Sequence, residues 1–200
     1  MWVALNICAF IMLAAVLYDQ VAKRITYRYS SLPPKQGTIR LLCLLPNKDM
    51  TASIQCRLFN YSLESGQGNH LYEALSYVWG DPKDTVPIFI GRQSFNVTKN
   101  LHSALLHLRN HSRERILWVD AICINQANDK EKEDQIRFMA KIYSQANCVV
   151  VWLGESADNS CQALEDIRTT AERESADIMY NHQKIIALLQ RPWFSRIWVS

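Results

Sequence analysis

The feature of the sequence that most constrains the fold is a change of hydrophobic period near residue 100. Upstream, apolar and polar residues alternate, as in Ile54 to Phe59, and a period of two residues predicts strands. Downstream, apolar residues recur at the spacing of one helical face: Leu101, Ala104, Leu105 and Leu108. The chain therefore combines strands with helices.

A β-α-β unit follows that first helix. Arg115 to Asp120 predicts a strand, and Cys148 to Leu153 is a continuous apolar run of the kind that is buried in a parallel sheet. Between them, one helical face carries Ile136, Met139, Ala140 and Tyr143. This order predicts an α/β fold with a mostly parallel sheet flanked by helices.

Further strands are predicted before that unit, and further helices after it. The predicted strands are Ile39 to Leu45, Ile54 to Phe59 and Tyr72 to Trp79, with a hairpin of Val86 to Ile90 and Ser94 to Val97 around Gly91. We expect Asn100 to cap the helix that follows the hairpin. Asp158 to Ile178 and His182 to Gln190 are predicted to be helices.

The N-terminal segment carries the one compartment signal. Trp2 to Tyr18 is apolar apart from Asn6, which is barely long enough to span a bilayer. The basic residues follow this segment, so an anchor here leaves the remainder cytosolic. We predict an apolar leader or membrane anchor over residues 1–20 and a linker over 21–38. The alternatives are a helix packed on the domain and a mispredicted first exon, and the protein is expected to be cytoplasmic in each case.

The charge distribution and the cysteine spacing argue against nucleic acid as a partner and against zinc or redox motifs. The net charge of +3 comes from 22 basic and 19 acidic residues that are spread along the chain, so nucleic acid is not an expected partner. The six cysteines lack the short spacing of zinc or redox motifs, which favours a reducing compartment. His107 and His111 are one helical turn apart without a nearby third ligand, and no metal site is predicted.

Candidate site residues follow from position, because no phosphate loop, dinucleotide fingerprint or nucleophile elbow is present. In open α/β sheets, ligands gather beyond the carboxyl ends of strands. The ligand-binding candidates at these ends are Trp79, Gly80, Asp81, Asp120, Asn125 and Gln126. We favour the interpretation that Asp81 and Asp120 brace turns and that the two amides satisfy loop backbone groups, with direct ligand contact as the alternative.

Glu131 is the catalytic candidate. The arrangement Asn128-x-x-Glu131 is a capping box, which places Glu131 in the first turn of its helix. A carboxylate at that point is also compatible with facing a ligand at the strand ends. Capping is the favoured interpretation, and ligand contact is the alternative.

Three blocks carry a resemblance to a known family. They are Tyr72-Glu-Ala-Leu-Ser-Tyr-Val-Trp-Gly-Asp81, Trp118-Val-Asp-Ala-Ile-Cys-Ile-Asn-Gln126 and Arg191-Pro-Trp-Phe-Ser-Arg-Ile-Trp-Val199. In order and spacing they resemble the heterokaryon-incompatibility (HET) domain of filamentous fungi over residues 39–200, with a core at 72–200. The family's next residues, Gln-Glu, would follow Ser200, so we expect a domain that is incomplete at its C-terminus. Lys132 stands where the family usually has Arg.

The resemblance implies a signalling module of fungal self/non-self recognition and programmed cell death that acts by association with other proteins, self-association included. HET domains in turn resemble, remotely, the flavodoxin-like Toll-receptor-type (TIR) domains, some of which cleave NAD with a glutamate. In that comparison Trp198 stands four residues before the glutamate, which then falls beyond Ser200. The alternatives are a TIR-like hydrolase with NAD as substrate and an inactive membrane-anchored fragment. No resident cofactor is implied.

Overall fold

The computed structural model describes residues 26–33, 37–64, 70–157, 159–173 and 182–196. The predicted leader at 1–20, including Trp2 to Tyr18, lies outside the described residues, as does part of the predicted linker. Within these ranges, no helix combines the length and the apolar character that a membrane crossing requires.

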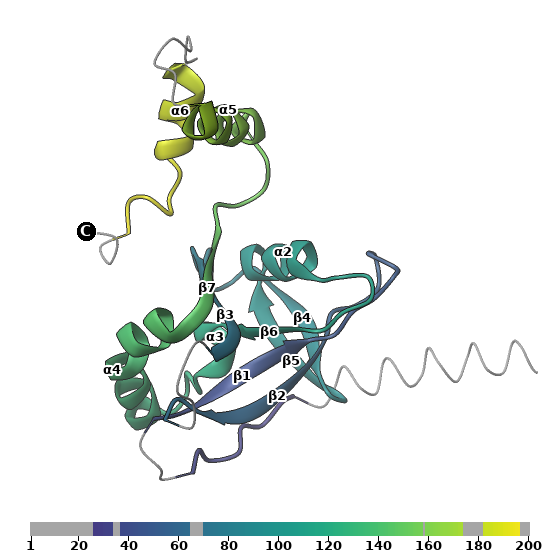
Figure 1. The fold of residues 1–200 in the computed structure, drawn as a ribbon. Helices are drawn as coiled ribbons and strands as arrows, with labels where there is room; N and C mark the ends of the chain where they lie inside the picture. The colour runs from purple at the N-terminus through teal and green to yellow at the C-terminus, as the bar shows by residue number, and fades with distance from the viewer. Residues whose placement is uncertain (1–25, 34–36, 65–69, 158, 174–181, 197–200) are drawn as a thin grey trace, which may run out of the picture.

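The described strands form one seven-stranded sheet in the order β5-β4-β2-β1-β6-β3-β7 (Figure 1). Their bounds are β1 Thr38–Leu44, β2 Gln55–Ser62, β3 His70–Tyr77, β4 Thr85–Ile90, β5 Gln93–Thr98, β6 Arg115–Trp118 and β7 Ala146–Trp152. Strands β6 and β7 lie on either side of β3 and run parallel to it. The predicted β-α-β unit and the α/β class are therefore confirmed.

The N-terminal half makes the sheet mixed. Strand β1 is buried along its whole length and runs antiparallel to both of its neighbours, with Leu42 opposite Leu58 of β2 and Leu117 of β6. Strands β4 and β5 form the predicted hairpin, whose turn needs the positive φ of +61° at Gly91. The added N-terminal strands and the hairpin are thus present, and β1 joins them to the parallel part.

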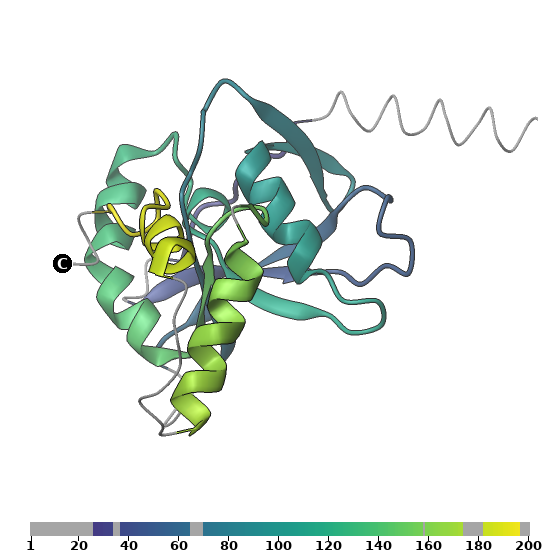
Figure 2. The ribbon, with the colours of Figure 1, turned by 90° about the horizontal axis from the view of Figure 1, so that it is seen from above.

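Helices pack on the sheet, and a separate helical pair lies beyond the end of β7 (Figures 1 and 2). The helices are α2 Lys99–Leu108, α3 Asp120–Cys123, α4 Asp129–Gln145, α5 Ser160–Arg173 and α6 His182–Leu189. Helix α2 packs on β4 and β5, and α4 packs on β3 and β7. Helix α4 is fixed by the Tyr72 hydroxyl, which donates to the Ile142 carbonyl at 2.6 Å, and by an edge-on contact of Trp118 with Tyr143.

The expected cap of α2 is wrong. Thr98, not Asn100, is the N-cap residue, and its hydroxyl accepts the backbone N–H of Leu101. Asn100 instead donates its amide to the Val78 carbonyl at 2.6 Å and accepts the indole N–H of Trp152 at 2.9 Å. Asn100 therefore joins the ends of β3 and β7, a role that local spacing does not reveal.

Strand β7 differs from the expectation of a buried strand. It pairs with β3 on one side, and no described strand pairs with its other side. The side chains of Val149 and Val151 are 47% and 40% exposed. An apolar run alone does not separate a central strand from an edge strand, which explains the error.

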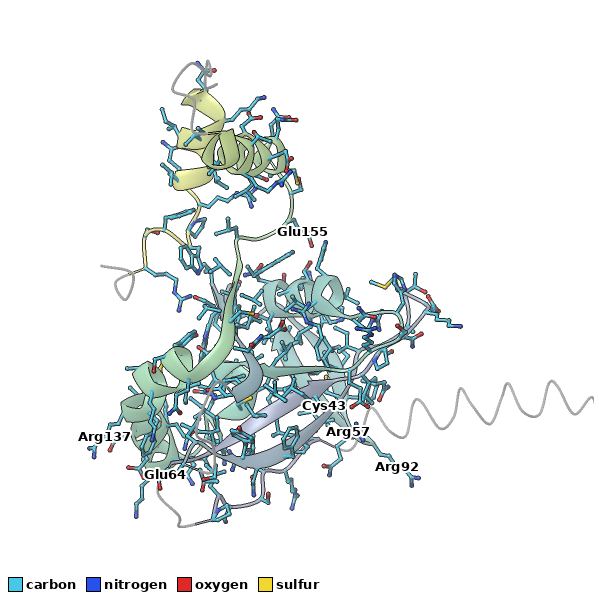
Figure 3. All side chains as sticks on the ribbon, viewed as in Figure 1. Cys43, Arg57, Glu64, Arg92, Arg137 and Glu155 are labelled. Atoms are coloured by element: carbon cyan, nitrogen blue, oxygen red, sulfur yellow. The ribbon has the colours of Figure 1, made fainter. Side chains whose placement is uncertain are left out.

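The α5–α6 pair lies beyond the end of β7, away from the sheet (Figure 1). Arg191 ties the pair to the segment after β7, because its guanidinium donates to the carbonyls of Leu153 and Glu155 at 3.0 and 3.1 Å. The Glu155 carboxylate accepts a hydrogen bond from the Ser103 hydroxyl of α2. Figure 3 shows Glu155 between α2 and the α5–α6 pair.

Candidate functional site

The carboxyl ends of β3 and β6 bring Trp79 and Asp120 together. The two strands are parallel neighbours, with Ala74 opposite Trp118, so the residues that follow them emerge at the same end of the sheet. The indole Nε1 of Trp79 donates to Asp120 Oδ2 at 2.9 Å. The loops that follow β3 and β6 therefore lie next to each other at this pair.

Asp120 is a largely buried carboxyl group with several donors around it. Burial raises its pKa above the usual 3.8, and hydrogen bonds from Trp79, the Ala121 backbone N–H and the Tyr77 hydroxyl oppose that rise. Burial, with Asp120 alongside, raises the pKa of Tyr77 well above 10, so Tyr77 remains a proton donor. The carboxylate is therefore held by three donors in a fixed orientation.

A cleft of about 440 Å³ opens above this pair. Its lining residues come from the ends of β3 and β6, from α4 and from the C-terminal segment: Tyr77, Val78, Trp79, Asp120, Ile124, Gln126, Lys132, Ile136, Met139 and Arg196. The walls are mostly apolar, while the polar groups are few. A cleft of this size and character is typical of small-molecule sites.

Three of the six ligand-binding candidates line this cleft, namely Trp79, Asp120 and Gln126. The amide nitrogen of Gln126 donates to the Asp120 carbonyl at 3.0 Å, which closes the loop after β6 on itself.

The other three candidates shape turns. Gly80 has a positive φ of +77°, which lets the chain turn sharply after Trp79. Asp81 Oδ1 accepts the Lys83 N–H at 2.9 Å, and Asn125 Oδ1 accepts the Ala127 N–H at 3.2 Å. Gly80, Asp81 and Asn125 are not among the residues that line the cleft.

Glu131 lies in a different place. Its carboxylate forms a bidentate ion pair with the buried Arg40 of β1 and also accepts the Asn125 N–H at 2.8 Å. Its own backbone N–H donates to Asn128 Oδ1, so Asn128 caps the helix as predicted. The second half of the capping box is not formed, because the Asn128 N–H donates to the Asn125 carbonyl instead. Glu131 borders a separate, more polar hollow beside Tyr29 and Gln135, and it is not among the residues that line the cleft with Asp120.

Several cleft residues were missed by the reasoning from sequence. Ile136 was placed only on the apolar face of a predicted helix, yet 49% of it is exposed and it lines the cleft. Arg196 enters from the C-terminal segment, where it donates to the Tyr77 carbonyl at 2.6 Å and to Ser76 Oγ at 3.3 Å. No local sequence pattern predicts the contact of Arg196 with Ser76, because the two residues are 120 positions apart in the chain.

The described residues include no group of three or more His, Cys, Asp and Glu side chains able to hold an ion. His107 instead packs its ring on Trp152, with centroids 4.8 Å apart.

The fold and cleft define an α/β domain with a small-molecule-sized cleft at the carboxyl ends of its parallel strands. The family model described as heterokaryon incompatibility protein (HET) matches residues 72–200, and the chain belongs to this family. It is similar to heterokaryon incompatibility protein 6, OR allele, of Neurospora crassa, with 37% identity over 162 residues. That match covers 74% of this chain and 23% of the relative, so the chain spans about a quarter of the relative's length. No solved structure gave a significant match.

Proposed function

We propose that this chain is a signalling module of fungal heterokaryon incompatibility, which acts in self/non-self recognition and cell death by associating with other copies of itself. Membership of the HET family and the similarity to an incompatibility protein of Neurospora crassa support the biological role. The observation that supports association is the outer edge of β7.

Among the residues that the structure describes, nothing gives the outer edge of β7 the usual protection against strand pairing. Edge strands are commonly guarded by Lys, Pro, bulges or short length. The seven residues of β7, Ala146-Asn-Cys-Val-Val-Val-Trp152, contain no charge and no Pro, and the α5–α6 pair lies beyond the strand rather than against it (Figure 1). An uncovered edge of this kind can accept a strand from a partner.

A second copy fits this edge. In a two-fold pairing, two β7 strands run antiparallel and each residue near the axis faces the same chemistry in its partner. Because β7 is uncharged, no like charges meet, and the exposed Val149 and Val151 side chains of both copies come together. The sheets of the two copies then become continuous.

The test is sedimentation of the 1–200 chain over a range of concentrations. We expect concentration-dependent association that Val149→Lys abolishes, because two lysines then meet near the axis. Met50→Lys is the matched control, since Met50 is a comparably exposed apolar residue in a loop. In a filamentous fungus, Val149→Lys should also suppress cell death and Met50→Lys should not. A chain that stays monomeric at all concentrations, or an equal response to both substitutions, refutes the proposal.

Cleavage of NAD is the second candidate function, and the Asp120 carboxyl in the cleft is the observation that favours it. Three hydrogen bonds already hold that carboxyl group, which suits orientation of a ligand better than attack on one. Association therefore remains the first proposal.

A further inference from the structure

Trp79 offers a flat surface in a fixed orientation at the cleft. Its side chain is 43% exposed although its indole nitrogen is bound to Asp120. An exposed tryptophan held in this way loses little conformational freedom when a ring packs on it. Ile136, which is also half exposed, and Met139 supply apolar surface from α4 in the same cleft.

The polar groups of the cleft are few and unlike one another. Among the described lining residues, Asp120 presents the one carboxylate, which accepts hydrogen bonds from donors such as the amino group of a nucleobase. Lys132 and Arg196 supply two cations, so the lining carries a net positive charge when Asp120 is ionised. Arg196 is held by the Tyr77 carbonyl and Ser76, which fixes its position. The cleft thus combines an apolar slot, an acceptor and a positive side.

We propose that this cleft binds a purine mononucleotide, with the base on Trp79 and against Ile136, its amino group toward Asp120, and the phosphate toward Lys132 and Arg196. A volume of about 440 Å³ suits a ligand of this size, whereas an amphipathic helix needs a long groove. Binding does not depend on the self-association through β7, because no residue of that strand lines the cleft.

The hydrogen bonds that Asp120 accepts favour binding of a ligand over reaction with it. Both of its oxygens accept hydrogen bonds, from Trp79 to Oδ2 and from the Ala121 N–H to Oδ1 at 2.7 Å. The carboxylate is therefore held in a position that suits it to orienting a base.

The experiment titrates the 1–200 chain with AMP, GMP, adenosine and ribose 5-phosphate by calorimetry. We expect AMP or GMP to bind more tightly than adenosine, and ribose 5-phosphate to bind weakly or not at all. Trp79→Ala should weaken nucleotide binding on the order of tenfold or more, because an aromatic platform under a base is lost. Lys132→Glu should weaken AMP binding and leave adenosine binding almost unchanged.

The matched control compares two exposed isoleucines in helices, one inside the cleft and one outside it. Ile136→Glu, in the cleft, should abolish nucleotide binding, whereas Ile186→Glu, in α6, should not. Circular dichroism melts establish that each variant is folded. The proposal is overturned if neither nucleotide binds at millimolar concentration, if Ile136→Glu and Ile186→Glu bind alike, or if ribose 5-phosphate binds as well as AMP. Failure of this test leaves the sedimentation result unaffected, so the two proposals are judged separately.

Discussion

Arg40 lies in the buried centre of the sheet and donates to the Glu131 carboxylate of α4 with both terminal nitrogens. Nη1 lies 2.5 Å from Oε1, and Nη2 lies 3.1 Å from Oε2. Only 2% of Arg40 is exposed. The same guanidinium donates to the carbonyls of Cys123 and Ser30 and lies over the Tyr29 ring, 4.9 Å from its centroid. One ion pair therefore connects the N-terminal segment, β1, the loop after β6 and α4.

Removal of the acidic partner should destabilise the whole domain. Glu131→Ala leaves the buried Arg40 without its counter-charge, and breaking a buried pair in this way costs about 3–5 kcal/mol of the free energy of unfolding. Urea denaturation measures the change. Glu133→Ala, at an exposed position of the same helix, is the control and should change stability by no more than about 0.5 kcal/mol. Similar losses in the two variants would show that the ion pair contributes little.

The bridge made by Asn100 should matter more than the cap of α2. Asn100→Ala removes two hydrogen bonds, to the Val78 carbonyl and from the half-buried indole of Trp152, and should cost about 1–3 kcal/mol. Thr98→Ala removes one cap bond, which is worth about 1 kcal/mol. Thermal melts of the two variants give the comparison. A larger loss for Thr98→Ala would mean that local capping dominates this part of the fold.

The titration of Asp120 should be visible at Trp79. Burial raises the Asp120 pKa above 3.8, despite the hydrogen bonds that favour the charged form. Because the folded chain then binds this proton more readily than the unfolded chain, the group destabilises the fold at neutral pH. That penalty is relieved as the pH falls through the raised folded pKa, and it is fully absent below the unfolded pKa.

The measurement is the ¹H–¹⁵N resonance of the Trp79 indole between pH 3 and pH 8. Since this N–H donates to Asp120, its shift should titrate with a midpoint above 3.8. Asp120→Asn should abolish the titration without removing the resonance. A midpoint at or below 3.8 would show that the carboxyl group is better solvated than its burial implies.

The local part of this fold could be predicted from the sequence, and the long-range part could not. Period and turn residues were enough for the β4–β5 hairpin, for α2 and for the cap that Asn128 makes at Glu131, because each depends on neighbours in the chain. The pairing of Arg40 with Glu131 spans 91 residues, and β1 carries no signal that its one charged residue is buried.

The same limit applies to the cleft. Trp79, Asp120 and Gln126 were predicted because they follow strand ends, where parallel topology alone brings residues together. Ile136 was not among the candidates, because a helical apolar face looks the same whether it meets the sheet or borders a cleft. Arg196 was missed because no strand or helix sets the position of its segment.

The last prediction is that the 1–200 chain does not release nicotinamide from NAD. A positioned carboxylate that moves a proton or assists bond cleavage typically contributes about 10²–10⁴-fold to the rate. Neither Glu131 nor Asp120 is free to act as that carboxylate. Glu131 is held by Arg40 and by the Asn125 N–H outside the cleft, and Asp120 is held by Trp79 and Ala121. Incubation of the purified chain with NAD, with nicotinamide followed by chromatography, gives the result. Glu131→Gln and Asp120→Asn serve as the comparison, since neither should change the background. Robust turnover that Asp120→Asn abolishes would make this cleft a catalytic site, and turnover abolished only by Glu131→Gln would move the reaction to the hollow beside Tyr29.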